Sequence, residues 1–292
     1  MVATVTDEQT AARELVRDWA RKLGTGAARQ VEQGDADAWR PVFASLAELG
    51  LFGVAVPEDR GGAGGSIEDL CAMVEEAAKA LVPGPVVTTA LATLAIDDPA
   101  LLGALASGER FAGLALDGDV RFDAETARAS GTAAWVLGGA PGGLLLLPAD
   151  GAWLLIDSAA DGVSLEPLAA ADFSRPLARV ELTSAAASLL ESPRVENLAA
   201  TLLAAEAAGV TRWSLDTAVA YAKVREQFGK PIGSFQAIKH LCAEMLCRAE
   251  QAEVVAADAA RAAADADEQQ FAIAAAVAAG ICIATAKANV KD

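Results

Sequence analysis

The stretch that decides the fold lies between residues 225 and 236 and reads Arg225-Glu226-Gln227-Phe228-Gly229-Lys230-Pro231-Ile232-Gly233-Ser234-Phe235-Gln236. Its glycines and proline predict a loop from Phe228 to Ser234. On both sides, from about Val195 onward, the chain is rich in alanine, the strongest helix former, which predicts helices. The last segment, from Phe271 to Asp292, is still helical where the sequence stops, with no glycine or proline after it. We expect a helical hairpin that needs a further helix to cover its apolar face, in a chain that ends early.

The region before these helices, from Phe111 to about Leu190, has a different pattern. Short runs of β-forming residues alternate with turn signals, such as the glycines around Pro141. The clearest runs are Trp135-Val136-Leu137, Leu144-Leu145-Leu146-Leu147 and Trp153-Leu154-Leu155-Ile156. This spacing predicts a small antiparallel barrel or sandwich, closed by Ser192-Pro193.

The first hundred residues have a helical period. Thr6-Asp7-Glu8-Gln9 predicts a helix N-cap, and a second helix ends at Gly50. We expect a short extended run over 51–57, a tight turn at the glycines of 61–65, and a helix capped by Ser66. Apolar residues recur at helical spacing at Leu15, Val16, Trp19 and Leu23, and then at Trp39, Val42, Phe43, Leu46 and Leu49. In the helix after Ser66, inward positions are expected at Ile67, Leu70, Met73 and Val74. A further short helix is expected to end at Ala106.

Composition excludes several classes of function. Of the 292 residues, 53% are hydrophobic and the net charge is −17. Such an acidic surface repels nucleic acid and anionic lipid, so neither is expected as a partner, and no membrane span is expected. Four cysteines without a Cys-x-x-Cys pair, together with the single histidine, argue against a zinc site, so no metal is expected. With no signal peptide, we expect a cytoplasmic protein with reduced thiols.

The twelve residues quoted above resemble the most characteristic motif of the acyl-CoA dehydrogenases, which desaturate acyl-CoA thioesters with FAD. Tyr221-Ala222 upstream and Lys239 and Met245 downstream agree with this resemblance. A second, weaker match is Gly50-Leu51-Phe52-Gly53-Val54-Ala55-Val56-Pro57-Glu58-Asp59. The resemblance covers almost the whole chain, and it looks most like the N-terminal half of actinobacterial enzymes that act on steroid side-chain CoA esters.

The resemblance implies a mainly α fold with a central β-domain. It places an N-terminal helical domain at 1–110, a middle antiparallel β-barrel at 111–192 and an incomplete C-terminal helical bundle at 193–292. In this family, residues of the first motif reach across a subunit interface to a neighbour's FAD. Here they are Arg225, Gln227, Phe228 and Gln236. A guanidinium suits a pyrophosphate, and amides with an aromatic ring suit adenosine. For an isolated run, pairing of Arg225 and packing of Phe228 would be the simpler reading; the full match favours FAD.

The chain departs from the family pattern where the chemistry occurs. The family's base is a glutamate, in most members well beyond residue 292 and in a minority on the first helix of the C-terminal bundle. That second position falls at about Ala199-Ala200, and neither residue can accept a proton. Glu206, two turns along, is interpreted as a solvated or packing-edge charge, with a catalytic role as the alternative. No catalytic residue is therefore expected in this chain.

The middle region also lacks the family's polar segments that hold the flavin ring. Phe111–Gly118 is apolar and short, and the strand around Trp135 keeps no polar contacts. Trp135 and Trp153 are interpreted as core residues because tryptophans at alternating strand positions usually pack inward. His240 is interpreted as a partly buried packing residue. Cys242 and Cys247 are interpreted as inert core thiols.

Three hypotheses follow. The first is a non-catalytic subunit, or half, of an acyl-CoA dehydrogenase that completes a partner's FAD site, with an electron-transfer flavoprotein as acceptor. The second is a self-sufficient acyl-CoA dehydrogenase whose catalytic glutamate lies beyond residue 292. The third is a non-enzymatic oligomerisation scaffold. Partners are an acyl-CoA substrate and homo- or hetero-oligomeric acyl-CoA dehydrogenase-like subunits, and the sequence leaves the acyl chain open.

Overall fold

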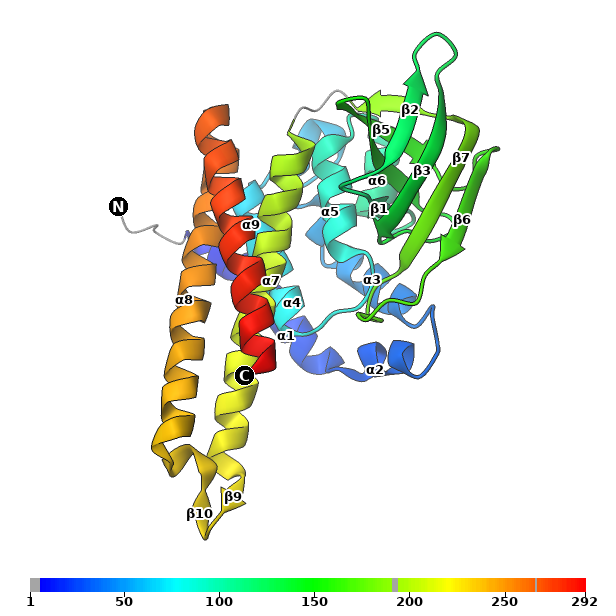
Figure 1. Ribbon diagram of the computed structural model, residues 1–292. Coiled ribbons are helices and arrows are strands. Elements are labelled where there is room, and N and C mark those ends of the chain that lie inside the picture. The colour runs from blue at the N-terminus through cyan, green and yellow to red at the C-terminus, as the bar shows by residue number, and fades with distance from the viewer. Residues whose placement is uncertain (1–5, 191–193, 266) are drawn as a thin grey trace. The chain divides into compact units, whose positions relative to one another are not determined.

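The fold is described from a computed structural model that defines residues 6–190, 194–265 and 267–292 (Figure 1). The chain forms two compact units, each assembled from segments that are distant in sequence. The helical unit comprises residues 6–21, 67–81 and 200–292, and the mixed unit comprises residues 22–66 and 82–199.

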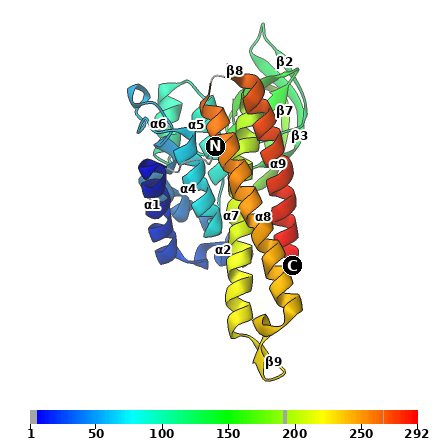
Figure 2. The ribbon, with the colours of Figure 1, turned by 90° about the vertical axis from the view of Figure 1, so that its left-hand side faces the viewer.

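Five helices make up most of the helical unit. They are α1 (Asp7–Leu23), α4 (Ile67–Lys79), α7 (Val195–Val224), α8 (Gln236–Ala264) and α9 (Glu268–Lys291). Both views show α8 and α9 lying side by side as an antiparallel pair (Figures 1 and 2). Their buried positions are mostly alanines, among them Ala249, Ala252, Ala256, Ala274 and Ala278. Small side chains let the two helices approach closely, so the alanine-rich composition serves packing as well as helix formation.

Local signals fix where α1 begins and how closely α7 packs. The Gln9 N–H donates to Thr6 Oγ1 (3.1 Å) and the Thr6 N–H donates to Gln9 Oε1 (3.2 Å). This reciprocal capping box confirms the N-cap expected from the sequence. On α7, a Cβ at Gly209 would overlap the backbone carbonyl of Glu75 on α4. Glycine is therefore required there for the two helices to meet.

The last helix is joined to its neighbours by polar contacts as well as by alanines. Asn289 is buried, and its Nδ2 donates to the carbonyls of Thr211 on α7 (3.3 Å) and Met245 on α8 (3.1 Å). Arg248 of α8 binds the Asp292 carboxylate (2.5 Å). By length and composition α9 could also cross a membrane. Its contacts with α7 and α8 are those of a bundle helix, and the absence of a membrane partner stays a prediction.

The mixed unit combines short helices with one sheet. The helices are α2 (Gly26–Glu32), α3 (Trp39–Glu48), α5 (Val86–Ala95) and α6 (Pro99–Ala106), with 3₁₀ turns η1 (Leu51–Gly53) and η2 (Glu58–Arg60). The strands are β1 (Ala112–Leu114), β2 (Asp119–Asp123), β3 (Arg128–Leu137), β4 (Leu144–Ala149), β5 (Ala152–Asp157), β6 (Val163–Pro167), β7 (Leu177–Ala186) and β8 (Ser188–Leu190).

The sheet has the order β6-β7-β3-β1-β4-β5-β8, with β2 paired to β3. Its core is formed by aliphatic side chains such as Leu145, Leu147, Leu154, Val136 and Val180. The mainly α fold with a central β-domain is confirmed. Within it, the expectation of a wholly antiparallel sheet is wrong, because β1 pairs with β4 in parallel. The hairpin of β2 and β3 lies between β1 and β4 in sequence, and β4 then runs beside β1 in the same direction.

A second expectation is also wrong. The run over 51–57 is not extended: Gly50 adopts a left-handed φ of 85° and the chain turns into η1. The Gly53 N–H donates to the Gly50 carbonyl (3.1 Å), which closes the turn. The residues look like a strand because both Leu51 and Phe52 are apolar, but both are buried as parts of a turn.

The three-domain division stays a prediction. Its first boundary, at 110, falls between the end of α6 and the start of β1. Its second boundary, at 192, and the Ser192-Pro193 closure lie outside the described residues.

Candidate functional site

A short β-hairpin joins α7 to α8 and carries the residues singled out in the sequence. It consists of β9 (Glu226–Gln227) and β10 (Lys230–Pro231), followed by the 3₁₀ turn η3 (Ile232–Ser234). The loop expected over 228–234 is therefore largely structured. Figures 1 and 2 show the hairpin at the end of α7 and α8, past the C-terminal end of α9. It is the most projecting part of the helical unit.

Phe228 has a conformation that folding alone does not explain. Phe228 (φ 54°) and Gly229 (φ 76°) are the two central residues of the turn, as a type I′ hairpin requires. Asparagine followed by glycine is the usual choice there, whereas a left-handed phenylalanine costs about 1–2 kcal/mol. The Phe228 side chain is also 92% exposed. So exposed a ring buries little surface within the chain to offset the strained backbone, which indicates a binding role.

The other three predicted side chains also face solvent. Arg225, Gln227 and Gln236 are exposed, and Arg225 forms no ion pair with any part of the chain that the structure describes. The Gln227 amide donates to the Glu226 carbonyl (2.8 Å). Gln236 Nε2 lies 3.4 Å from His240 Nε2. The structure thus brings all four residues to one end of the helical unit, with most of their hydrogen-bonding groups available to another molecule.

Basic residues gather around this hairpin. Lys223, Arg225, Lys230 and Lys239 lie within 17 residues of one another and are exposed, in a chain whose net charge is −17. Glu226 is the acidic residue of that segment. Such a local excess of cations in an acidic protein favours an anionic ligand.

The position of the family's minority base holds no proton acceptor. Ala199 and Ala200 lie on α7, the first buried and the second half-buried. Alanine cannot accept a proton, and the absence of a catalytic residue from this chain stays a prediction. Glu206 is half-buried on the same helix and belongs to the chain's own network of contacts.

Trp135 is not a core residue, so that interpretation is wrong. It is 66% exposed on β3, whereas Trp153 is buried as expected. A register shift in β3 between Ala133 and Val136 gives the reason: alternation from the buried Ala133 would turn Trp135 inward, but the shift makes Val136 the next buried residue and leaves Trp135 outward. Alternation visible in the sequence does not reveal such an irregularity within a strand.

Trp135 borders a hollow of about 460 Å³ within the mixed unit. Its other side chains are mostly apolar, and its two charged ones, Asp172 and Arg175, bind each other (2.8 Å). The hollow offers a flat aromatic surface but few side-chain groups for the hydrogen-bonding edge of a flavin. The hairpin, with its exposed guanidinium and amides, fits the diphosphate and adenosine parts of FAD better than this hollow fits the ring.

A buried ion network on α4 is a functional candidate that the sequence did not reveal. Glu75 and Glu76 are both buried in the helical unit. Glu75 binds Arg13 (2.8 Å) and Lys79 (2.8 Å). Glu76 binds Arg17 through two hydrogen bonds, of 2.8 and 3.2 Å. The partners on α1 are about sixty residues away in sequence, and such pairing has no local sequence signal.

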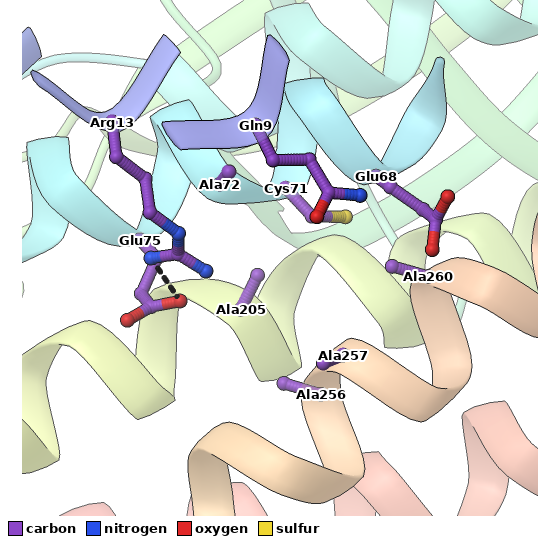
Figure 3. A pocket seen from close by; sticks show the side chains of 10 residues that line it. All are labelled: Gln9, Arg13, Glu68, Cys71, Ala72, Glu75, Ala205, Ala256, Ala257 and Ala260. Carbon is purple, nitrogen blue, oxygen red and sulfur yellow. Dashed lines mark ion pairs between the residues drawn. The ribbon is translucent and has the colours of Figure 1, made fainter. Parts of the chain in front are cut away.

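This network is structural rather than catalytic. Burial raises the pKa of Glu76, but hydrogen bonds from Arg17 and the charge of Lys79 outweigh burial, so its pKa is lowered. A carboxylate whose pKa is lowered in this way is a poor base. Figure 3 shows the adjacent cavity, of only about 70 Å³, with Arg13 reaching Glu75 and with Cys71 beside Gln9. Burial raises the pKa of Cys71 to about 12, so its thiol stays protonated.

The remaining predicted residues have plainer surroundings. His240 is exposed rather than partly buried, and Cys247 is exposed rather than a core thiol, so both interpretations are wrong. His240 lies near the start of α8, whereas Cys247 lies between Met245 and Arg248, which contact the end of α9, and is exposed all the same. Cys242 is half-buried. Within residues 6–190, 194–265 and 267–292, no three His, Cys, Asp or Glu side chains come together as metal ligands would.

Family models match both ends of the chain. Residues 6–102 match the N-terminal domain of acyl-CoA dehydrogenases and residues 197–289 match their C-terminal domain. The chain is 72% identical to acyl-CoA dehydrogenase FadE34 of Mycobacterium tuberculosis over all of its length, and covers 43% of that protein. It is 34% identical to acyl-CoA dehydrogenase IpdE2 of the same organism, with 88% of the chain and 76% of that protein aligned. The chain thus spans less than half of the first relative and most of the second.

Solved structures agree. A Tcur3481–Tcur3483 steroid acyl-CoA dehydrogenase variant superposes with a TM-score of 0.83 at 28% identity, over 98% of this chain and 87% of that one. The ChsE4–ChsE5 complex from Mycobacterium tuberculosis superposes with a TM-score of 0.79 at 25% identity, over 98% of this chain and 87% of that one. Butyryl-CoA dehydrogenase from Megasphaera elsdenii superposes with a TM-score of 0.80 at 19% identity, over 98% of this chain and 86% of that one. At this identity the match shows a shared fold alone.

Proposed function

The chain belongs to the acyl-CoA dehydrogenase family, and from that premise we propose that it is a non-catalytic part of such an enzyme that completes the FAD site of a catalytic partner. The observation that carries the proposal is Phe228, a strained and almost fully exposed aromatic residue at the tip of a basic hairpin. In the desaturation of an acyl-CoA thioester, a base removes the α-proton while FAD accepts the β-hydride. The partner would supply that base.

Each hairpin residue then has a defined task. Arg225 donates charge-assisted hydrogen bonds to phosphate oxygens of a dinucleotide held mainly by the partner. Gln227 and Gln236 offer amide groups to the adenosine part, and the exposed ring of Phe228 covers an apolar or aromatic surface there. The chain's acidic remainder keeps the assembly soluble, and the local excess of cations draws the anionic cofactor to the hairpin.

The comparisons support a heteromeric setting and a substrate class. One structural neighbour is a complex of two different chains, ChsE4 and ChsE5, and another is a steroid acyl-CoA dehydrogenase. We therefore propose a heteromeric or fused enzyme in the cytoplasm that desaturates acyl-CoA thioesters, with steroid side-chain thioesters as the leading substrates. An electron-transfer flavoprotein would reoxidise the flavin.

One observation supports a second candidate function. The chain covers only 43% of FadE34, so in that protein the matching part is followed or preceded by a long remainder. A self-sufficient enzyme with its base in such a remainder would use the same hairpin. A non-enzymatic scaffold has no use for a strained Phe228 or an unpaired Arg225, so the structure favours it less.

The test uses the assembly isolated through an affinity tag on this chain. We expect Arg225→Ala to raise the dissociation constant for FAD by about tenfold or more, because one charge-assisted hydrogen bond is lost. Arg29→Ala, an exposed arginine on α2, is the matched control and should leave FAD binding unchanged. Unaltered FAD retention in Arg225→Ala would point to the scaffold.

The isolated chain provides the second arm. It should bind little FAD and transfer no electrons from acyl-CoA to a dye acceptor. Dye reduction by the isolated chain would contradict the non-catalytic role, while leaving the family membership intact.

A further inference from the structure

We propose that Lys230 is a further phosphate-binding residue of the hairpin and that Phe235 is the positioning residue that holds it there. This inference rests on the proposed function and deepens it, because it assigns a second cation to the diphosphate of the dinucleotide. Neither residue was among the four singled out from the sequence.

The register of the hairpin places Lys230 with the predicted donors. Lys230 pairs with Gln227, and Pro231 pairs with Glu226. Directly opposed residues share a face, and successive residues alternate between faces. The Ile232 N–H donates to the Arg225 carbonyl (2.8 Å), which continues the pairing by one residue. Arg225, Gln227 and Lys230 therefore share one face, and the acidic Glu226 is on the other.

An aromatic contact holds the ammonium group. Lys230 Nζ lies 4.6 Å from the centroid of the Phe235 ring, within the range of a cation–π interaction. The same ring meets Phe228 edge to face, at a centroid distance of 6.0 Å and an interplanar angle of 85°. Phe235 thus contacts both the lysine and the exposed aromatic tip, and one half-buried ring orders two exposed side chains.

No acidic group in the described part of the chain accounts for this lysine. Lys230 is exposed and forms no ion pair across residues 6–190, 194–265 and 267–292. A lysine on a hairpin can serve solubility alone, but then nothing is gained by restraining a side chain that has four rotatable bonds. An ammonium held over a ring, beside an arginine and an amide, is arranged to bind an anion with two or more negative charges. A diphosphate has that chemistry.

The experiment compares ligands with and without the diphosphate. The tagged assembly is stripped of flavin and titrated with FAD and with riboflavin, for the wild type, Lys230→Gln, Lys230→Arg and Lys287→Gln. Loss of a charge-assisted bond should weaken FAD binding by about tenfold in Lys230→Gln. Riboflavin binding should be unchanged, and Lys230→Arg should restore most of the FAD affinity. Lys287→Gln removes the same charge from an exposed position on α9, outside the hairpin, and should change FAD affinity by less than about twofold.

The role of Phe235 is tested by coupling. Phe235→Leu should weaken FAD binding but add little in the Lys230→Gln background, because both changes remove the same contact. If the two effects simply add, Phe235 does not act through Lys230. A thermal melt of each variant separates this outcome from a loss of folding.

The arms also separate the two proposals. If Arg225→Ala weakens FAD binding and Lys230→Gln does not, the inference about Lys230 is overturned and the proposed function stands. If neither variant changes FAD binding, the proposed function itself fails. Equal weakening of FAD and riboflavin by Lys230→Gln would also overturn the inference, because it would show a contact with the ring or a general distortion rather than with phosphate.

Discussion

Two groups of charged residues in the helical unit are built in opposite ways. Around α4, the carboxylates of Glu75 and Glu76 are buried and bound by three cations from two helices. At the hairpin, Arg225 and Lys230 are exposed and form no ion pair among the residues described. The first group is separated from solvent and fully paired, whereas the second is fully solvated and left unpaired.

The difference shows that, within one unit, some charged residues stabilise the fold and others are available for binding. A buried charge must be paired, because an unpaired one loses several kcal/mol of hydration. An exposed and unpaired charge contributes almost nothing to folding. Where such charges lie beside a strained Phe228, a requirement outside the chain explains them best. Substitutions at five residues, together with a change of pH, test this difference.

The largest effect is expected at Glu76, whose side chain is 3% exposed. Glu76→Ala leaves Arg17 and Lys79 without their shared partner, and breaking a buried pair in this way costs about 3–5 kcal/mol. The free energy of unfolding, measured by urea titration with circular dichroism, should fall by about that amount. Glu226→Ala, the matched change on the hairpin, should stay within about 0.5 kcal/mol. Equal losses of unfolding free energy at the two sites would show that the buried and the exposed charges do not differ in this way.

The next effect is at the arginines. Arg17→Ala removes two hydrogen bonds to Glu76, but Arg13 and Lys79 remain and Arg17 is half-exposed, so we expect a loss of about 1–2 kcal/mol. Arg225→Ala should change stability by less than about 0.5 kcal/mol while weakening FAD binding. Melting temperatures of both variants, measured side by side, test this. A destabilised Arg225→Ala protein would assign that arginine to the fold.

A smaller effect, with the opposite sign, is expected at the hairpin tip. Phe228→Asn replaces a strained residue by one that tolerates a left-handed conformation, so the free energy of unfolding should rise by roughly 0.5–1 kcal/mol. FAD binding by the assembly should weaken at the same time. Urea unfolding measures the gain in stability, and FAD titration measures the loss of binding. A variant that loses stability would show that the ring supports folding.

The smallest effects are expected on acidification. Because the pKa of Glu76 is lowered on folding, its contribution is complete above the ordinary value of 4.5 and is lost as pH falls through the lowered pKa. Melting temperature should therefore decline below about pH 4.5. The decline should be shallower in Glu76→Gln, which has no proton to gain at that position. Identical slopes would show that Glu76 does not contribute.

Parts of the fold that depend on local signals could be predicted from the sequence. The Thr6–Gln9 cap, the helices on either side of residues 225–236 and the inward face of α4 all follow from spacing within a few residues. The four hairpin residues were also identified from the sequence, through a twelve-residue resemblance. Their gathering at one exposed end is a consequence of two long helices joined by a tight turn.

Features that depend on distant partners could not be predicted. Arg17 and Glu76 are 59 positions apart, and no pattern announces their pairing. Trp135 shows a different limit, since the register shift between Ala133 and Val136 reverses the alternation within one strand and has no clear sequence signal. The left-handed Phe228 shows a third: a phenylalanine before a glycine does not reveal its backbone angles until the turn is seen.

The turn at Phe228 also provides a way to read function from other sequences. Every generation in which nothing binds this hairpin would favour replacement of phenylalanine by asparagine or glycine, since both relieve the backbone at no cost to the core. The proposed function therefore expects related chains that use this contact to keep an aromatic residue at the position, and chains that have lost the contact to accept asparagine or glycine.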